Sequence, residues 1–166
     1  MQKEVFFETA KFLTQNSRCT LIGSLCLYIN APQLLDRDVH DVDIFADFNE
    51  QNLRLIILLL ESLGFEVYSW QDRIDSSVPM SLLKGRYYIR GIRDGFHVDV
   101  TYEEDGISYS EMQRYEYIKD GIRLYNCDGL IRLLSVSDRD DHISQMNKLV
   151  QYTSEKASDC GELDIT

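Results

Sequence analysis

Apolar residues in the first 40 positions recur at intervals that change from one segment to the next. Residues 3–15 carry apolar side chains at helical spacing, whereas residues 19–22 form a short apolar run typical of a buried strand. Ser24 follows this run and can cap a helix, which Pro32 would stop. Residues 33–39 show neither periodicity and are expected to form a loop. The pattern therefore predicts helix, strand, helix and loop, in that order.

The spacing of apolar residues changes twice in the next segment, residues 41–70. Residues 41–46 alternate polar and apolar side chains, as a half-buried strand does. Asp47 and Glu50 are spaced like a capping box that opens a long apolar helix, and Gly64 suits the C-terminal end of that helix. Residues 65–70 alternate again and are rich in residues that favour strands. We expect strand, helix and strand here.

The second half of the chain begins with a hairpin pattern and ends with helical ones. Residues 86–93 and 96–102 are strand-like and are joined by an Asp-Gly dipeptide at 94–95, which favours a tight antiparallel turn. Residues 130–136 and 143–152 carry apolar side chains at helical spacing. This half is therefore predicted to contain an antiparallel hairpin followed by two helices.

Taken together, the elements predict an α/β (α+β) fold, with a mixed β-sheet of about five strands backed by helices and with C-terminal helices. The length of 166 residues suits one domain, expected over residues 1–154 and followed by a polar, flexible tail at 155–166. No apolar run approaches the roughly 17 to 25 residues of a membrane span, and the N-terminal residues lack a secretory signal pattern. A cytoplasmic location with no membrane contact is expected.

The four cysteines are spaced too widely for a zinc site. No Cys-x-x-Cys pair or nearby His pair is present, so reduced thiols are expected. Cys19 and Cys26 flank the Gly-Ser turn among apolar residues and are expected to be small core residues.

The net charge of −11 disfavours nucleic acid as a partner and favours cations, including divalent metals and cationic small molecules. One local cluster runs against this trend. Four basic residues within ten positions could hold phosphates or could equally form a solvated strand face. They are Lys84, Arg86, Arg90 and Arg93.

Two short motifs carry the chemistry. Gly23 and Ser24 form a turn between a strand and a helix, where a glycine leaves room for a phosphate and the helix start supplies N–H groups. Asp41 and Asp43 share one face of a strand, where two carboxylates repel each other unless a cation lies between them. The ordinary alternatives are a serine-capped turn and a solvated edge strand. The combination predicts a metal-dependent enzyme that handles phosphates.

The second hairpin strand offers further candidates. Asp99 is expected to be a third carboxylate, either a metal ligand or the base that takes a proton from an acceptor hydroxyl. His97 lies on the same strand face and is either an ordinary histidine or an acceptor-side ligand or proton shuttle. Arg37 either binds phosphate or neutralises Asp38 or Asp41.

With these residues identified, the chain resembles the nucleotidyltransferase superfamily related to DNA polymerase β. That pattern consists of a Gly-Ser or Gly-Gly turn, a helix, an Asp-x-Asp pair and a later lone Asp. The matching positions are Gly23-Ser24, Asp41-Val42-Asp43 and Asp99.

Two compact bacterial branches are more similar still: the lincosamide adenylyltransferases and the abortive-infection toxin-like nucleotidyltransferases. Their Arg-x-Thr-x-Asp-x-Asp run is similar to residues 37–43, with Val39 in place of Thr. Residues 118–149 look like the closing helices of these branches. The toxin-like branch usually has a Lys where this chain has Leu134, which favours the small-molecule branch.

The resemblance implies transfer of a nucleoside monophosphate, AMP first among them, from an NTP such as ATP to a hydroxyl of a small, possibly cationic acceptor, with release of pyrophosphate. Mg²⁺ or Mn²⁺ is the implied cofactor. Two alternatives stay open: a toxin-like transferase acting on tRNA or protein, and a module that binds a nucleotide or partner without turnover. A homodimer could complete the acceptor pocket. The implied site comprises Asp41, Asp43 and Asp99 for catalysis and metal, Gly23, Ser24 and Arg37 for the nucleotide, and His97, Arg86 and Arg90 on the acceptor side.

Overall fold

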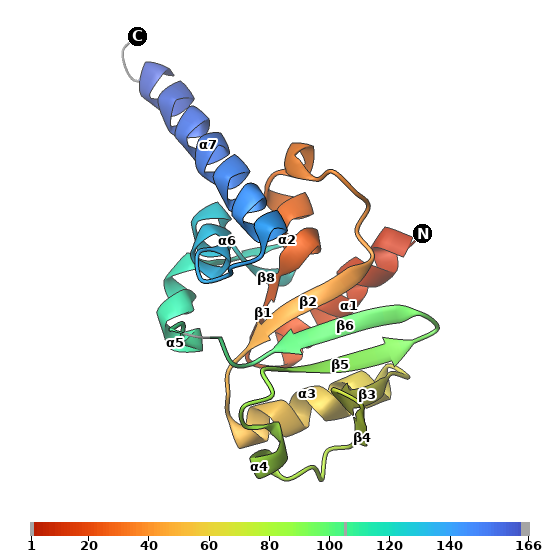
Figure 1. Ribbon diagram of the computed structural model, residues 1–166. Coiled ribbons are helices and arrows are strands. Elements are labelled where there is room, and N and C mark those ends of the chain that lie inside the picture. The colour runs from red at the N-terminus through yellow and green to blue at the C-terminus, as the bar shows by residue number, and fades with distance from the viewer. Residues whose placement is uncertain (1, 105, 164–166) are drawn as a thin grey trace.

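The computed structural model describes residues 2–104 and 106–163, which form a mixed β-sheet with helices packed on it (Figure 1). Eight strands in these residues run in the order β4-β3-β5-β6-β2-β1-β8-β7. The predicted α/β (α+β) class is confirmed, but the sheet has eight strands where about five were expected. The strands are β1 (Cys19–Ile22), β2 (Asp41–Ala46), β3 (Glu66–Ser69), β4 (Asp72–Ile74), β5 (Tyr88–Arg93), β6 (Phe96–Thr101), β7 (Glu116–Lys119) and β8 (Ile122–Tyr125).

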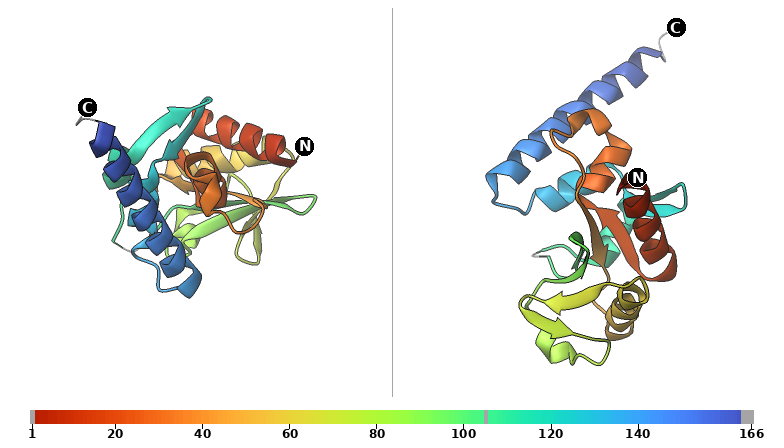
Figure 2. Two further views of the ribbon diagram at one scale, coloured as in Figure 1. Left: turned by 90° about the horizontal axis from the view of Figure 1, so that it is seen from above. Right: turned by 90° about the vertical axis from the view of Figure 1, so that its right-hand side faces the viewer.

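The helices divide into two groups. Figure 2 shows α1 and α3 along one side of the sheet, while α2, α6 and α7 gather near β1 and β8 (Figure 1). Short 3₁₀ segments lie at Pro32–Leu34 and Gln113–Tyr115. The helices are α1 (Gln2–Asn16), α2 (Gly23–Asn30), α3 (Glu50–Ser62), α4 (Met80–Leu83), α5 (Tyr109–Met112), α6 (Cys127–Leu134) and α7 (Asp140–Leu163).

The core lies between the sheet and the α1–α3 side. Val42 and Ile44 of β2 and Val98 of β6 are completely buried there, together with Leu13 of α1 and Leu60 of α3. Because side chains alternate along a strand, burial of the even-numbered residues of β2 turns its odd-numbered residues to the opposite face. That opposite face carries the candidate site.

Two predicted helix starts were wrong by a few residues. The N-cap of α3 is Asn49, whose side chain accepts a hydrogen bond from the Asn52 amide at 3.2 Å, and not Asp47. Asp47 is instead occupied by an ion pair with Arg18. Ser24 lies inside the first turn of α2, because the positive φ of Gly23 turns the chain directly from strand into helix.

Three strands were not predicted. β4 is short and mostly exposed, and β7 and β8 form a second hairpin on Asp120-Gly121, a dipeptide of the same kind as 94–95. The last helix was predicted to end at residue 152 but continues to Leu163. Residues 153–158 are polar or charged except for Ala157, so they carry no apolar stripe that would reveal a helix. The flexibility expected for 155–166 stays a prediction, and residues 164–166 lie outside the described part.

The thiols of Cys19 and Cys26 are buried, as predicted, and burial raises the pKa of each to about 12. These two and Cys127 are free cysteines. In the described residues, the helices are too short or too polar to cross a membrane.

Candidate functional site

The predicted carboxylates lie side by side on the open face of the sheet. β2 and β6 are parallel neighbours, and their register places Asp43 beside Asp99 and Asp41 beside His97. On the other side of β6, the antiparallel strand β5 places Arg90 opposite Asp99. Side chains at paired positions of neighbouring strands point to the same face. The structure therefore brings four predicted site residues and Arg90 into one patch.

Gly23 touches this patch from β1. The register of β1 and β2 pairs Ile22 with Asp43, so the following turn passes directly over the Asp43 carboxylate. Gly23 has a φ of +72°, and a methyl group added there would lie 2.8 Å from Asp43 Cβ and 2.9 Å from Asp43 Cγ. A glycine is required here both for backbone conformation and for space.

The start of α2 has free hydrogen-bond donors. Ile22 occupies the N-cap position, and its side chain caps no amide; among the described residues no side chain is seen to accept from the first-turn amides. Gly23, the first residue of α2, lies against the Asp43 carboxylate. Helix N-termini of this kind bind anionic groups through N–H donors and the helix dipole.

The Asp43 carboxyl has a strongly shifted pKa. Burial, followed by the charges of Asp99 and Asp41, raises the pKa of Asp43 to about 7, and the cations Arg90 and Arg37 only partly oppose this rise. The patch thus holds more negative charge than its own basic residues compensate. A bound cation would remove this imbalance.

Oxygen donors at this place suit a hard divalent cation, although a complete protein cage is not formed. Among residues 2–104 and 106–163, no three His, Cys, Asp or Glu side chains converge to hold a metal ion. Asp41 and Asp43 can supply two carboxylates, and Mg²⁺ is commonly bound by one or two carboxylates together with substrate phosphates. The donors present therefore suit a hard divalent cation such as Mg²⁺ or Mn²⁺ that takes its remaining ligands from outside the protein.

Arg90, which was predicted as an acceptor-side residue, is hydrogen-bonded to Asp99. Its Nε donates to Asp99 Oδ1 at 2.7 Å and its Nη2 donates to Asp99 Oδ2 at 3.0 Å. The planar guanidinium thus engages both carboxylate oxygens.

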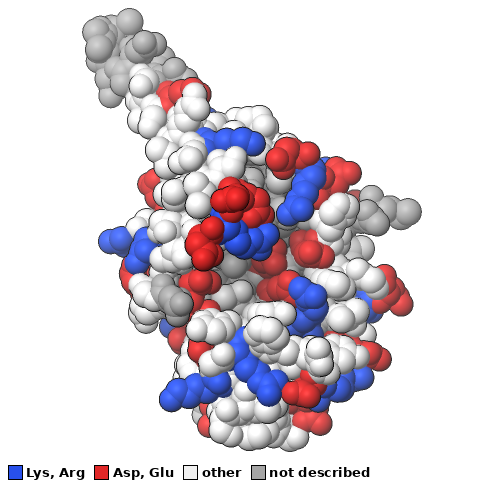
Figure 3. Space-filling model, viewed as in Figure 1, with Lys and Arg blue, Asp and Glu red and all other residues white. Residues whose placement is uncertain are grey.

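The remaining basic residues of the 84–93 cluster are also engaged, apart from the exposed Lys84. Arg86 forms an ion pair with Asp72 at 2.8 Å, and Arg93 donates to the Leu63 carbonyl. Figure 3 shows basic and acidic side chains interspersed over the viewed face, with no broad basic patch. Two residues of the cluster, Arg86 and Arg90, are therefore in ion pairs, and Arg93 is hydrogen-bonded to the backbone.

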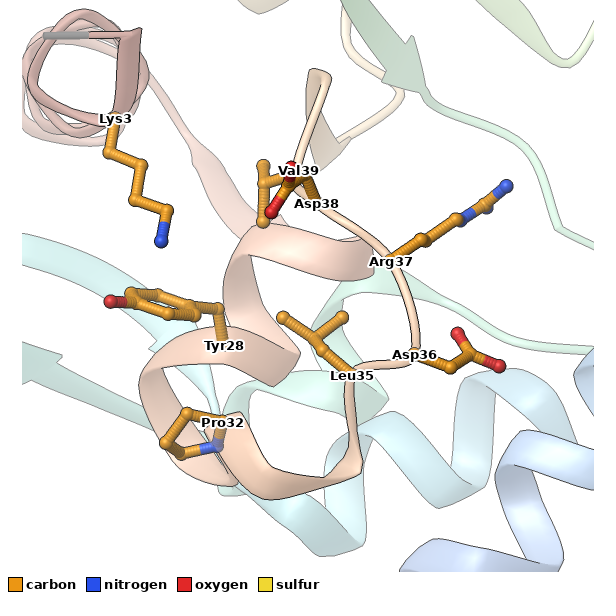
Figure 4. Close-up of a pocket in the computed structure, with 8 residues that line it drawn as sticks. All are labelled: Lys3, Tyr28, Pro32, Leu35, Asp36, Arg37, Asp38 and Val39. Carbon is orange, nitrogen blue, oxygen red and sulfur yellow. The ribbon is translucent and has the colours of Figure 1, made fainter.

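Arg37 lies in the exposed loop before β2 and makes no ion pair with a described residue. It lines a pocket of about 490 Å³ together with Lys3 and Tyr28. Lys3 Nζ lies 4.4 Å from the centre of the Tyr28 ring, and Figure 4 shows Arg37 directed away from this pair. The alternative role of Arg37 as a partner of Asp38 or Asp41 is not seen as an ion pair, but its charge does act on Asp43.

A second pocket, of about 400 Å³, lies farther along the same sheet face. It begins at Phe45, two residues beyond Asp43, and its lining contains aromatic and acidic side chains but no Lys, Arg or His. Sequence reasoning missed this pocket, because its walls come from three separated segments. The lining residues are Phe45, Asp47, Phe48, Tyr87, Tyr102, Glu103, Glu104, Gly106, Ile107, Ser108, Tyr109 and Ser110.

Comparison with known proteins rests on structure. No protein-family model matches the chain, and no curated protein matches its sequence. Among solved structures, the chain is similar to a protein of Thermotoga maritima that is provisionally named a nucleotidyltransferase. The two are 16% identical, the match covers 93% of this chain and 94% of that one, and the TM-score is 0.50.

Two further solved structures are similar. One is ANT(2″)-Ia in complex with adenylyl-2″-tobramycin, with 13% identity, coverage of 95% and 94%, and a TM-score of 0.56. The other is the Megavirus polyadenylate synthase, with 12% identity, coverage of 90% of this chain and 31% of that chain, and a TM-score of 0.54. At such low identities these similarities establish the fold alone.

Proposed function

We propose that this chain, which has the nucleotidyltransferase fold, moves a nucleoside monophosphate from an NTP to a hydroxyl group of a small acceptor. The observation that carries the proposal is the register that sets Asp41, Asp43 and Asp99 on one face beside the Gly23 turn. Carboxylates next to free helix N–H donors can bind a nucleotide triphosphate together with its cation.

The chemistry follows from these positions. The acceptor oxygen forms a bond to the α-phosphorus, the bond between that phosphorus and the bridging oxygen breaks, and pyrophosphate leaves. Ser24, the amides of α2 and Arg37 would hold the phosphates, and Asp41 and Asp43 would hold Mg²⁺ or Mn²⁺. That ion supplies charge neutralisation for the phosphates. Asp99 lies beside Asp43 and can take the proton that the acceptor hydroxyl releases.

The second pocket supports a cationic acceptor. Phe48 is 41% exposed and stacks on Tyr102 with ring centres 5.4 Å apart, and Tyr87 is 43% exposed. Aromatic faces and carboxylates attract cationic groups. The described lining residues include the acids Asp47, Glu103 and Glu104 and no basic residue, and Arg18 pairs with Asp47 from outside this lining. This pocket lies along the strands that carry the carboxylates, so an acceptor held in it could present a hydroxyl to the nucleotide.

A screen for pyrophosphate release tests this function. The purified chain is incubated with Mg²⁺, each of the four NTPs and one acceptor at a time, drawn from aminoglycosides, lincosamides and bulk tRNA. We expect ATP with a cationic small molecule to give release, and Phe48→Ala to raise the KM for that acceptor severalfold while leaving the KM for ATP unchanged. Absence of release with every combination would contradict the proposal.

A binding module without turnover is the second candidate, because Arg90 occupies Asp99 and the described carboxylates do not form a three-ligand metal group. Calorimetry with NTP and Mg²⁺, followed by analysis of the same sample for pyrophosphate, separates the two candidates. Binding with the nucleotide recovered intact in the presence of acceptors would favour the module. A tRNA-modifying transferase has less support, since the arginines of the 84–93 cluster are already engaged by protein groups.

A further inference from the structure

Arg90 is fixed against the third carboxylate of the patch. Its two hydrogen bonds, of 2.7 and 3.0 Å, use both oxygens of Asp99, whose side chain is only 20% exposed. The Arg90 guanidinium also lies 5.8 Å from the centre of the Tyr88 ring. An ion that used Asp99 as a ligand would have to share its oxygens with this guanidinium and lie close to that positive charge.

The position of Arg90 in the sheet is equally constrained. Arg90, Asp99 and Asp43 occupy paired positions on the three neighbouring strands β5, β6 and β2. The pairing of the strands thus places the permanently charged Arg90 guanidinium on one side of the three carboxylates, next to Asp99. On the other side, Asp41 and Asp43 form no ion pair with a side chain of the described part of the chain, whereas Asp99 is paired with Arg90.

Resting on the proposed function, we propose that Arg90 takes the place of a second metal ion, so that the site binds one divalent cation, held by Asp41 and Asp43. Three carboxylates and one guanidinium leave two negative charges, which a single divalent ion neutralises. The absence of a three-ligand group among the described residues agrees with this count. Asp99 is then oriented by Arg90 and is not a metal ligand, and Arg90 is a positioning residue.

Counting Mn²⁺ ions tests the inference without any turnover. The chain is titrated with Mn²⁺ in the presence of a saturating non-hydrolysable ATP analogue, and free Mn²⁺ is measured by electron paramagnetic resonance against an analogue-only blank. We expect the unmodified chain to bind one Mn²⁺. We expect Asp99→Asn to bind one as well, with an affinity changed by less than about twofold, and Arg90→Met to bind a second.

The controls separate charge from folding. Arg90→Lys keeps a positive charge and should bind one Mn²⁺. Arg73→Met removes an arginine whose ion pair with Glu66, at 3.6 Å, lies elsewhere on the sheet, and it should also bind one. Circular dichroism establishes that each variant is folded. If Arg90→Met does not fold, Asp99→Asn decides the question, since losing a true metal ligand would weaken binding by about tenfold or more.

Three outcomes overturn the inference while leaving the proposed function standing. They are two Mn²⁺ bound by the unmodified chain, a loss of Mn²⁺ affinity of about tenfold or more in Asp99→Asn, and a folded Arg90→Met that still binds one ion. Absence of both Mn²⁺ and nucleotide binding in the unmodified chain would instead contradict the proposed function itself.

Discussion

Gly23 is required both for the positive φ of the turn after β1 and for the space next to the Asp43 carboxylate. Replacement by alanine would force a side chain into the positive φ region and against the Asp43 carboxylate. We expect Gly23→Ala to lower the free energy of unfolding by about 1–3 kcal/mol and to weaken NTP binding at least tenfold. Chemical denaturation and calorimetry measure the two effects.

Gly95 provides the matched control for that substitution. It has a φ of +78° in the turn between β5 and β6, and a Cβ there would meet no atom within 4 Å. Gly95→Ala should cost a similar backbone strain, of about 1 kcal/mol, with unchanged NTP affinity. Equal NTP affinity in Gly23→Ala and Gly95→Ala would show that the turn at Gly23 does not shape the binding site.

The ionised Asp43 carboxylate should destabilise the metal-free fold as pH rises. Its pKa of about 7 lies above the ordinary value of 3.8, so between these values the folded chain holds a proton that the unfolded chain has released. The full shift corresponds to about 4 kcal/mol, and the partial exposure of Asp43 reduces this to on the order of 2 kcal/mol. Asp43→Asn should therefore be more stable than the unmodified chain at pH 8 and no more stable at pH 4.

Urea denaturation at pH 4, 6 and 8 in the presence of a chelator checks this sign. Asp94→Asn is the control, because Asp94 is exposed in a turn and asparagine also tolerates its φ of +50°. Parallel stability curves for Asp43→Asn and the unmodified chain across this pH range would contradict the assigned charge imbalance.

At the scale of elements, Asn52 connects α3 to one end of the β1–β2 pair, where β1 begins and β2 ends. Its side chain accepts from the Arg18 amide at 2.9 Å and donates to the carbonyls of Arg18 and Asp47, each at 3.0 Å. Removing it takes the partner from the Arg18 amide and the Asp47 carbonyl in a part-buried setting, whereas the Arg18 carbonyl keeps its hydrogen bond from the Asp47 amide. Asn52→Ala should lower the free energy of unfolding by about 2–3 kcal/mol.

The adjacent Gln51 is exposed on α3, and Gln51→Ala should change stability by less than about 0.5 kcal/mol. Both variants are measured by urea denaturation at one pH. If the two cost the same, the side chain of Asn52 does not hold α3 in place.

Turn chemistry and apolar periodicity explain which elements could be predicted. The hairpin of β5 and β6 was predicted correctly from its Asp-Gly turn, where Asp94 and Gly95 both have positive φ. The hairpin of β7 and β8 has the same turn at Asp120-Gly121 but was missed, because β7 carries an Ile118 that is 66% exposed and shows no buried alternation. An Asp-Gly turn can be recognised in the sequence alone. An edge strand such as β7 lacks the alternation of buried and exposed residues that would identify the turn as part of a hairpin.

At the scale of the whole molecule, the site is only partly readable from sequence. Strand alternation predicted that Asp41 and Asp43 share a face, and the structure adds that Asp99 lies beside Asp43. The pairing of Arg90 with Asp99 was missed, although the two-residue turn at 94–95 fixes the register that places these residues opposite each other. The aromatic and acidic pocket depends on tertiary folding in the same way. The acceptor, the choice of NTP and a homodimer stay predictions.

The fate of two differently labelled phosphates in ATP tests the central claim most directly. The chain is incubated with Mg²⁺, an acceptor that supports turnover and ATP labelled at either the α- or the γ-phosphorus. We predict that the acceptor gains the α-label but never the γ-label, and that Asp41→Asn combined with Asp43→Asn abolishes this transfer. Transfer of the γ-label, or α-labelling that survives the double substitution, would contradict the account.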